Sequence, residues 1–185
     1  MAELPERVEL VIDSVADQAE RAEFQRAGLW LGAVWNEATE GTNGVGLCLL
    51  ERQALTIRRD EHFRGRHAAL TCSASPVFDA EGGLLAVLNV SSAREDLSRQ
   101  RRFHTMALTN LSAKLIESCF FLQHCEGNYL LRFHAQPEYI GLLSEGLLAF
   151  DGEGRITAIN ETALNLLASS REALLGRPLE TVLDV

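Results

Sequence analysis

A polar, glycine-containing run from Thr39 to Val45 constrains the fold of this chain more than any other feature of its sequence. Glycines recur within the run and just after it, and they permit left-handed backbone and close approach of the chain to another group. Thr42 and Asn43 precede an apolar segment that ends at Leu50, so either side chain is suited to cap a helix there. The run is therefore predicted to be a loop that enters a helix, with free N–H groups able to face a small molecule. Taken alone, a plain capped helix is the simpler interpretation.

Side chains in and around this loop supply the groups of a candidate binding site. An aromatic ring stacks on a small apolar body, carboxylates accept hydrogen bonds, hydroxyl and amide groups do both, and histidine changes charge near neutral pH. The residues predicted to line one cavity are Trp35, Glu37, Thr42, Asn43, Glu61, His62 and Cys72. Each also has a structural alternative: Trp35 as a core residue, or His62 as a ring that fixes the loop through a backbone hydrogen bond. His67 follows two arginines and is predicted to be solvated.

Hydrophobic periodicity predicts the surrounding elements. Strands are expected at residues 8–12, 55–57, 70–78 and 84–90, with the last of these in the centre of a sheet because it is apolar on both faces. Helices are expected at residues 16–27 and 97–123. The longer helix carries two apolar stripes, of which one can pack on the sheet and the other on a partner, although a single core helix is equally consistent with it. Residues 146–160 are predicted to form a hairpin around an Asp-Gly-Glu-Gly turn, and Asn160 is predicted to cap the helix that follows.

Composition limits the class of protein. The chain has 185 residues, enough for one ordinary domain and part of a second. It contains no apolar run of about 18 residues and no basic–apolar signal sequence at its start, which predicts a cytoplasmic protein without a membrane span. The net charge of −9 argues against direct binding of a phosphate backbone by this segment.

The four cysteines, at positions 48, 72, 119 and 125, show no metal-binding or redox spacing. Cys48 and Cys119 fall on apolar helix faces and are expected in the core. Cys72 is the one expected beside the binding site. The favoured interpretation is that it is a buried side chain that fills space and has no chemical role. No metal site and no cofactor are predicted, since His62 and His67 lie five residues apart with no recurring carboxylate–histidine cluster.

Four ordered sequence blocks resemble the sensory GAF domain of bacterial activators that work with sigma-54, closest to the acetoin-catabolism and dihydroxyacetone-operon regulators. The blocks are Trp35–Glu37, Gly41–Asn43, Glu61–Phe63 and Thr71–Pro76. Outside these blocks the chain departs from the family in the closing strand, which commonly reads Leu-Asp-Val and here reads Leu88-Asn89-Val90. The hairpin, Asn160 and the later Leu-Gly-Arg-Pro segment are similar to the first half of a PAS domain.

This resemblance implies an α+β fold (an α/β sandwich): a GAF-like antiparallel sheet with helices, followed by a partial PAS-like domain. The implied boundaries are residues 1–124 for the GAF-like domain, 125–136 for a connector and 137–185 for the partial PAS-like domain. Both ends are expected to be cut, with a helix and a strand of the GAF domain preceding the chain. The long helix, residues 97–123, is expected to mediate a homodimer.

The resemblance implies a non-catalytic region that senses an effector and controls a downstream ATPase and a DNA-binding helix-turn-helix. A short diol or ketone such as acetoin is the candidate effector, while DNA, ATP and sigma-54 RNA polymerase would contact only domains absent here. Two alternatives stay open. One is a GAF-fold methionine sulfoxide reductase with Cys72 as the nucleophile and Cys48 as the resolving thiol. The other is a module that docks a partner protein.

Overall fold

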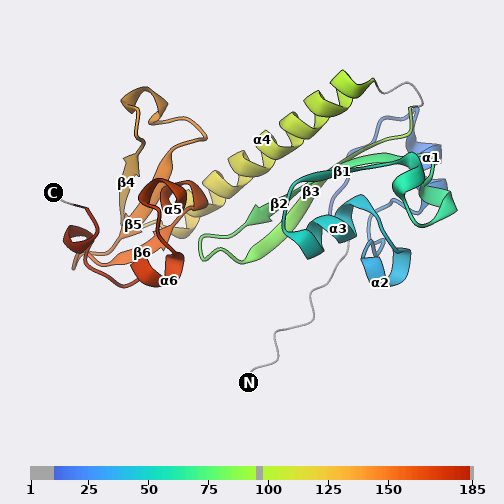
Figure 1. Cartoon of the computed structure of the whole chain (residues 1–185). Coiled ribbons are helices and arrows are strands. Elements are labelled where there is room, and N and C mark those ends of the chain that lie inside the picture. The colour runs from blue at the N-terminus through green and yellow to red at the C-terminus, as the bar shows by residue number, and fades with distance from the viewer. Residues whose placement is uncertain (1–10, 95–97, 184–185) are drawn as a thin grey trace. The chain divides into compact units, whose positions relative to one another are not determined.

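The computed structural model describes residues 11–94 and 98–183 (Figure 1). The chain divides into two compact units. The first comprises Met1–Pro76 and Val87–Asn110, and the second comprises Val77–Ala86 and Leu111–Val185. Most of the strand predicted at residues 8–12 lies outside the described residues. Helices and antiparallel strand pairs together make the fold α+β, as the sequence predicted.

The first sheet has the strand order β1-β2-β3, formed by Leu55–Arg58, Thr71–Phe78 and Leu84–Ser92. β1 and β2 pair antiparallel with Ile57 opposite Cys72. β2 is buried along nearly its whole length, so it is the central strand. The expectation that residues 84–90 form the central strand is wrong for the described part of the chain, because β3 lies at the edge there and its side chains are mostly half-buried.

Short helices connect the elements of the first unit: α1 (Arg21–Ala27), α2 (Glu37–Glu40), α3 (Gly44–Glu51), η1 (Arg59–Glu61) and η2 (Gly65–His67). The helix predicted to begin at residue 16 begins only at Arg21. Two acidic side chains explain the delay. Asp17 accepts a hydrogen bond from the Ala19 N–H, which competes with helix formation. Glu20 accepts instead from the Ala93 N–H of the chain beyond β3, at 2.8 Å. Gly28 ends α1 in the left-handed region, at φ 84°.

The long helix α4 spans Arg99–His124, within two residues of its predicted bounds at each end. Ala113 and Phe121 are buried, whereas the predicted leucine stripe of the helix is exposed. That stripe consists of Leu108, Leu111, Leu115 and Leu122. Cys119 is exposed as well, so its expected place in the core is wrong. Its spacing from the leucines had put it on an apolar face, and that face is not covered by the described chain.

The second sheet has the order β4-β5-β6, from Tyr129–Phe133, Gly146–Phe150 and Ile156–Ile159, with both pairs antiparallel. Its remaining elements are η3 (Pro137–Tyr139), α5 (Glu161–Leu167), α6 (Arg171–Leu174) and η4 (Leu179–Thr181). The segment expected as a connector, residues 125–136, thus contains a strand of this sheet. Two buried clusters cover the faces of the sheet. Phe121, Leu147 and Ala149 belong to one, and Leu148, Ile159 and Leu164 to the other.

Asn160 joins the end of β6 to the rest of the second unit. Its side-chain oxygen accepts from the Ala163 N–H at 2.8 Å, as predicted for a helix cap, and from the Leu147 N–H at 3.0 Å. Its amide nitrogen donates to the Glu145 carbonyl at 3.1 Å. One side chain therefore caps α5 and fixes the start of β5.

We expect Asn160→Ala to lower the free energy of unfolding of the second unit by about 2–4 kcal/mol, because a helix cap and two further backbone partners are lost together. Urea denaturation, monitored by hydrogen exchange of the backbone amides of residues 129–175, measures this loss. Asn165→Ala, at an exposed position of α5, is the matched control and should change stability by less than about 0.5 kcal/mol. Equal effects of the two substitutions would contradict this role of Asn160.

Candidate functional site

The glycine-containing loop is organised by two asparagine caps. Asn36 accepts from the Thr39 N–H at 2.8 Å and caps α2. Asn43 accepts from the Gly46 N–H at 2.8 Å and caps α3, while its amide donates to the Gly41 carbonyl at 2.9 Å. Asn43 is completely buried. The predicted loop-to-helix transition is present, and Asn43 rather than Thr42 provides the cap.

Trp35 and His67 form the aromatic part of a buried cluster beside this loop. Their ring centroids lie 4.6 Å apart in a stacked arrangement, and the Trp35 indole N–H donates to the Gly28 carbonyl at 2.8 Å. His67 has no exposed surface, so the prediction that it is solvated is wrong. The 3-10 turn η2 carries its ring inward onto Trp35, which the local sequence of charged residues did not reveal.

A buried carboxylate balances the charges of the cluster. Glu40 is 7% exposed, and its two oxygens both lie 2.5 Å from the Arg66 guanidinium. His67 Nε2 lies 3.4 Å from Glu40 and accepts from Arg66 Nε–H at 3.2 Å. Because a buried charge is costly without a partner, Arg66 and Glu40 are best understood as one unit. Neither was among the residues predicted from the sequence.

His62 is buried at the edge of the same cluster. Its ring lies 6.0 Å from the His67 ring, and its Nδ1 contacts the Arg59 carbonyl at 3.2 Å. The alternative in which His62 fixes its loop through the backbone is thus present in the structure. The neighbouring Phe63 N–H donates to the Thr42 carbonyl at 3.0 Å, which ties the His62 segment to the glycine-containing loop.

Cys72 lies under the first residue of α3. A Cβ atom at Gly44 would stand 2.7 Å from the Cβ of Cys72, so only glycine allows this approach. Cys72 Sγ lies 3.2 Å from the Ser91 hydroxyl, which also accepts from the Asn89 amide at 2.9 Å. Trp35 and Cys72, far apart in the sequence, belong to one core cluster.

The remaining predicted residues lie outside the centre of the cluster. Glu61 is exposed and accepts from the Arg58 N–H at 2.7 Å, so its carboxylate braces η1. Glu37 and Thr42 are half-buried at the rim. The cluster thus unites Trp35, Asn43, His62 and Cys72 with four residues that the sequence did not single out for the site. Those four are Glu40, Arg66, His67 and Ser91.

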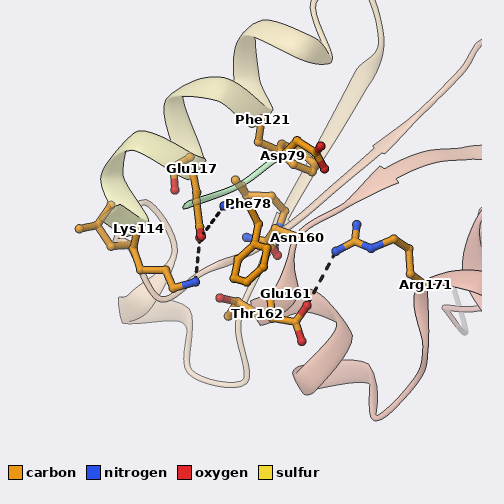
Figure 2. A pocket seen from close by; sticks show the side chains of 12 residues that line it. Phe78, Asp79, Lys114, Glu117, Phe121, Asn160, Glu161, Thr162 and Arg171 are labelled. Carbon is orange, nitrogen blue, oxygen red and sulfur yellow. Dashed lines mark hydrogen bonds and ion pairs between the residues drawn. The ribbon is translucent and has the colours of Figure 1, made fainter. Parts of the chain in front are cut away.

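Two cavities are noted in the described part of the chain. None of the seven predicted residues lines either of them, although Ser91 of the cluster lines the larger one. The cavity in the second unit measures about 40 Å³, room for little more than water (Figure 2). Within it Glu117 accepts from the Phe78 N–H at 3.0 Å and from Lys114 at 2.8 Å, and Arg171 donates to the Ala80 carbonyl at 2.7 Å. The groove in the first unit measures about 430 Å³, and arginines, serines and threonines of β3 and α4 contribute to its lining.

Burial keeps both histidines of the cluster neutral. It lowers the pKa of His62 below the ordinary 6.5, although the Arg59 carbonyl and the Glu61 charge act in the opposite direction. It lowers the pKa of His67 as well, opposed chiefly by the Glu40 carboxylate. A neutral imidazole donates from one nitrogen and accepts at the other, so each ring offers one of each.

The thiols do not fit the reductase alternative. Burial raises the pKa of Cys72 to about 11 and that of Cys48 to about 12. The thiolate is the nucleophile in cysteine chemistry, and almost none forms at neutral pH with such values. For metals, the described residues contain no group of three or more histidine, cysteine, aspartate or glutamate side chains placed to hold an ion.

Comparisons with known proteins point to a class of transcriptional regulators. No family model matches the chain. It is 32% identical over 180 residues to the acetoin catabolism regulatory protein of Cupriavidus necator, covering 95% of this chain and 27% of that protein. It is 29% identical over 175 residues to a signal-transduction and transcriptional-control protein of Clostridium beijerinckii, again covering 95% of this chain and 27% of the relative.

A shorter match links the chain to the acetoin dehydrogenase operon transcriptional activator AcoR of Bacillus subtilis. It is 32% identical over 69 residues and covers 37% of this chain and 11% of that protein. The fold is similar to the crystal structure of the Escherichia coli DhaR(N)–DhaL complex, with a TM-score of 0.54, 18% identity and coverage of 94% of this chain and 58% of that one. The predicted resemblance to acetoin-catabolism regulators is confirmed, and the DhaR(N) structure shows a similar fold. The chain spans about a quarter of the length of the two curated relatives that it matches over most of its own length.

The histidines give the first unit a stability that depends on pH. Their folded-state pKa values lie below the unfolded value, so protonation favours the unfolded chain as the pH falls below about 6.5. We expect the free energy of unfolding to be constant above pH 7.5 and to decrease below pH 6.5, by up to about 1.4 kcal/mol per pH unit for each histidine. Urea denaturation between pH 5.5 and 8 measures the slope. His67→Gln should reduce it, and His104→Gln, at an exposed position, should leave it as in the unmodified protein.

Cysteine alkylation tests the burial of the thiols. In the folded protein at pH 7.5, iodoacetamide should modify the exposed Cys119 and leave Cys48 and Cys72 unmodified until urea unfolds the chain. Mass spectrometry of tryptic peptides reads out each site. Rapid alkylation of Cys72 in the folded protein would restore the enzyme alternative.

Proposed function

We propose that this chain is the effector-sensing region of a sigma-54-dependent transcriptional activator, with no catalytic activity of its own. The observation that carries the proposal is the buried polar cluster around Trp35 and His62, built on a chain whose relatives are transcriptional regulators. A cluster dedicated only to stability would gain from an apolar side chain in place of Glu40, because its ion pair with the half-exposed Arg66 contributes little net stability. Retained polar groups in a buried loop suit recognition of a small polar molecule.

We propose a GAF-like domain at residues 1–124 and a partial PAS-like domain at residues 137–185, in a cytoplasmic protein. The connecting segment, residues 125–136, contributes β4 to the sheet of the second unit. The described chain contains no helix that is both long enough and apolar enough to cross a membrane. The relatives are several times longer than this chain, which leaves room for an AAA+ ATPase and a helix-turn-helix in the complete protein. DNA, ATP and sigma-54 RNA polymerase would be contacted by those domains.

A homodimer through α4 is the proposed assembly. Leu108, Leu111, Leu115 and Leu122 step at intervals of three, four and seven residues and are each at least 42% exposed. Such a stripe on one helix is typical of a surface that packs against a partner helix. Since α4 also continues from the first unit into the second, its packing provides a route by which effector binding biases the downstream domains.

The effector is proposed to be a small neutral molecule of the acetoin class, as the names of the relatives suggest for those proteins. A partner protein is the second candidate for the signal, favoured by the neighbouring structure, which is a complex of DhaR(N) with DhaL. The two signals differ in where they act. A metabolite reaches the buried cluster, whereas a protein acts on the surface.

Deletion of residues 1–185 from the complete regulator tests the proposed function. We expect ATP hydrolysis and sigma-54-dependent transcription in vitro to continue but to lose their response to inducing conditions, because the sensory region no longer biases the ATPase. Leu111→Glu is a second variant that should weaken the dimer, measured by sedimentation, with Gln123→Glu as a control at an exposed position of the same helix. Unchanged regulation after the deletion would refute a sensory role.

A further inference from the structure

The groove of the first unit gathers positive charge in a chain that is acidic as a whole. It measures about 430 Å³, and its lining includes Arg94, Arg101 and Arg102 against one acidic side chain, Glu20. The net charge of the whole chain is −9. A cleft lined by one sign of charge raises the local concentration of ligands of the opposite sign. The charge of the groove therefore favours an anion.

The stability of α4 does not explain why arginines stand at its start. The helix begins at Arg99, its first turn contains no acidic side chain, and Arg101 and Arg102 follow within that turn. The free N–H groups of a helix N-terminus carry partial positive charge, so a basic side chain is unfavourable there and an anion is favourable. An anion bound in the groove beside this turn would offset that cost.

Two of the three guanidinium groups are available to a ligand. Arg101 forms no side-chain hydrogen bond or ion pair within the described residues. Arg94 lies 3.9 Å from both Asp17 and Glu20 and is 58% exposed, so these pairs contribute little. Glu20 already accepts from the Ala93 N–H at 2.8 Å. The acidic side chain of the groove thus leaves both arginines free to bind another group.

A buried hydroxyl on β2 points to the same conclusion independently. Thr71 lines the groove and is only 7% exposed, yet its hydroxyl has no hydrogen-bond partner among the described residues. Ser73, two residues along the strand, is by contrast paired with Thr56 at 3.0 Å. Buried hydroxyls are nearly always paired. The Thr71 hydroxyl is therefore a donor that a ligand in the groove can use.

This groove is separate from the polar cluster beside the glycine-containing loop. Successive side chains of a strand point to opposite faces of the sheet, and Cys72 lies under Gly44 of α3. Thr71 and Ser73 consequently point to the other face. A ligand of the groove contacts that face and the first turns of α4, not the cluster around Trp35.

The balance of groups in the groove selects the chemistry of the anion. Three arginines against one glutamate suit a group with two charges, and a phosphate ester carries about −1.5 to −2 near neutral pH, whereas a carboxylate carries one. Guanidinium groups also bind phosphate oxygens in pairs. The groove is too large for a phosphate ion alone, and side chains with a hydroxyl outnumber the two apolar ones, Val90 and Leu108. The hydroxyl-bearing residues are Thr71, Ser73, Ser91, Ser92 and Thr105.

We propose that this groove is a binding site for a small phosphate ester with a hydroxylated body. Arg94 and Arg101 bind the phosphate, Arg102 adds positive charge beside it, and the Thr71 hydroxyl donates to one of the ligand's oxygens. Because the ligand contacts both β2 and α4, its binding stabilises the packing of the helix start on the sheet. The site does not depend on the proposed sensory function.

Four compounds test the ligand chemistry: sn-glycerol 3-phosphate, D-glycerate, glycerol and inorganic phosphate. Isothermal titration of the full chain at low salt should show sn-glycerol 3-phosphate binding most tightly, about tenfold above glycerate and inorganic phosphate, with no detectable binding of glycerol. The affinity should fall as salt is added. Equal affinity for glycerate or glycerol, or for inorganic phosphate, would overturn the assignment of a phosphate ester.

Two arginines of the same helical turn provide a matched pair of variants. Arg101→Gln removes a charge that lines the groove and should weaken binding of sn-glycerol 3-phosphate about tenfold. Arg99→Gln removes the same charge from an exposed position that does not line the groove, so it should change binding less than about twofold. Equal losses in the two variants would show a general attraction to the helix start and would overturn the site.

Substitutions at Thr71 test the buried donor. Thr71→Val keeps the shape of the side chain and removes the hydroxyl, so it should weaken binding of sn-glycerol 3-phosphate about tenfold. Thr71→Ser keeps the hydroxyl and should bind within about twofold of the unmodified chain, which a role in packing alone would not require. Thermal unfolding of each variant checks that it is folded. Unchanged binding in Thr71→Val, or a loss in Thr71→Ser as large as in Thr71→Val, would contradict the assigned role of this hydroxyl.

Discussion

The buried carboxylate of Glu40 is the group on which the arrangement of the first unit depends. It stands in a nearly dry position, where an unpaired charge is strongly unfavourable, and so requires the Arg66 guanidinium beside it. Arg66 and the neighbouring His67 come from the segment between β1 and β2, while Glu40 ends α2. Their pairing closes the loop over Trp35 and brings His62 next to the glycine-containing run. A polar requirement, more than apolar burial, sets the position of the candidate site.

The second unit depends on side chains that bind backbone groups at the ends of strands. Asn160 holds the start of β5 and the start of α5 together. Arg171 donates to the carbonyls of Ala80 and Ile159, which joins the turn between β2 and β3 to the end of β6. The strands of that turn also carry Cys72 and Asn89 in the first unit.

Sequence patterns predicted the elements whose signals are local. The bounds of α4, the hairpin of β5 and β6, and the caps at Asn43 and Asn160 follow from periodicity and from side chains that bond their own backbone. Predictions that needed to know what covers a surface were less successful. The same leucine spacing that located α4 placed Cys119 in the core, although that face is exposed. Apolar character likewise suggested a central place for residues 84–90, which form an edge of the described sheet.

For the candidate site, the sequence by itself determined the loop and its glycines, which permit close approach. It also predicted a helix cap at Thr42 or Asn43, and a common site for Trp35, His62 and Cys72. Only the tertiary structure decided which polar groups meet there. Glu40 comes from α2 and Arg66 and His67 from η2, and nothing in the local sequence of either element indicates that they meet. Asn89 was visible in the sequence as a departure from the family, but only the fold places its side-chain oxygen against Gly44. Propensities and caps act within a few residues, whereas the pairing of buried charges and acceptors is set by which distant segments fold against each other.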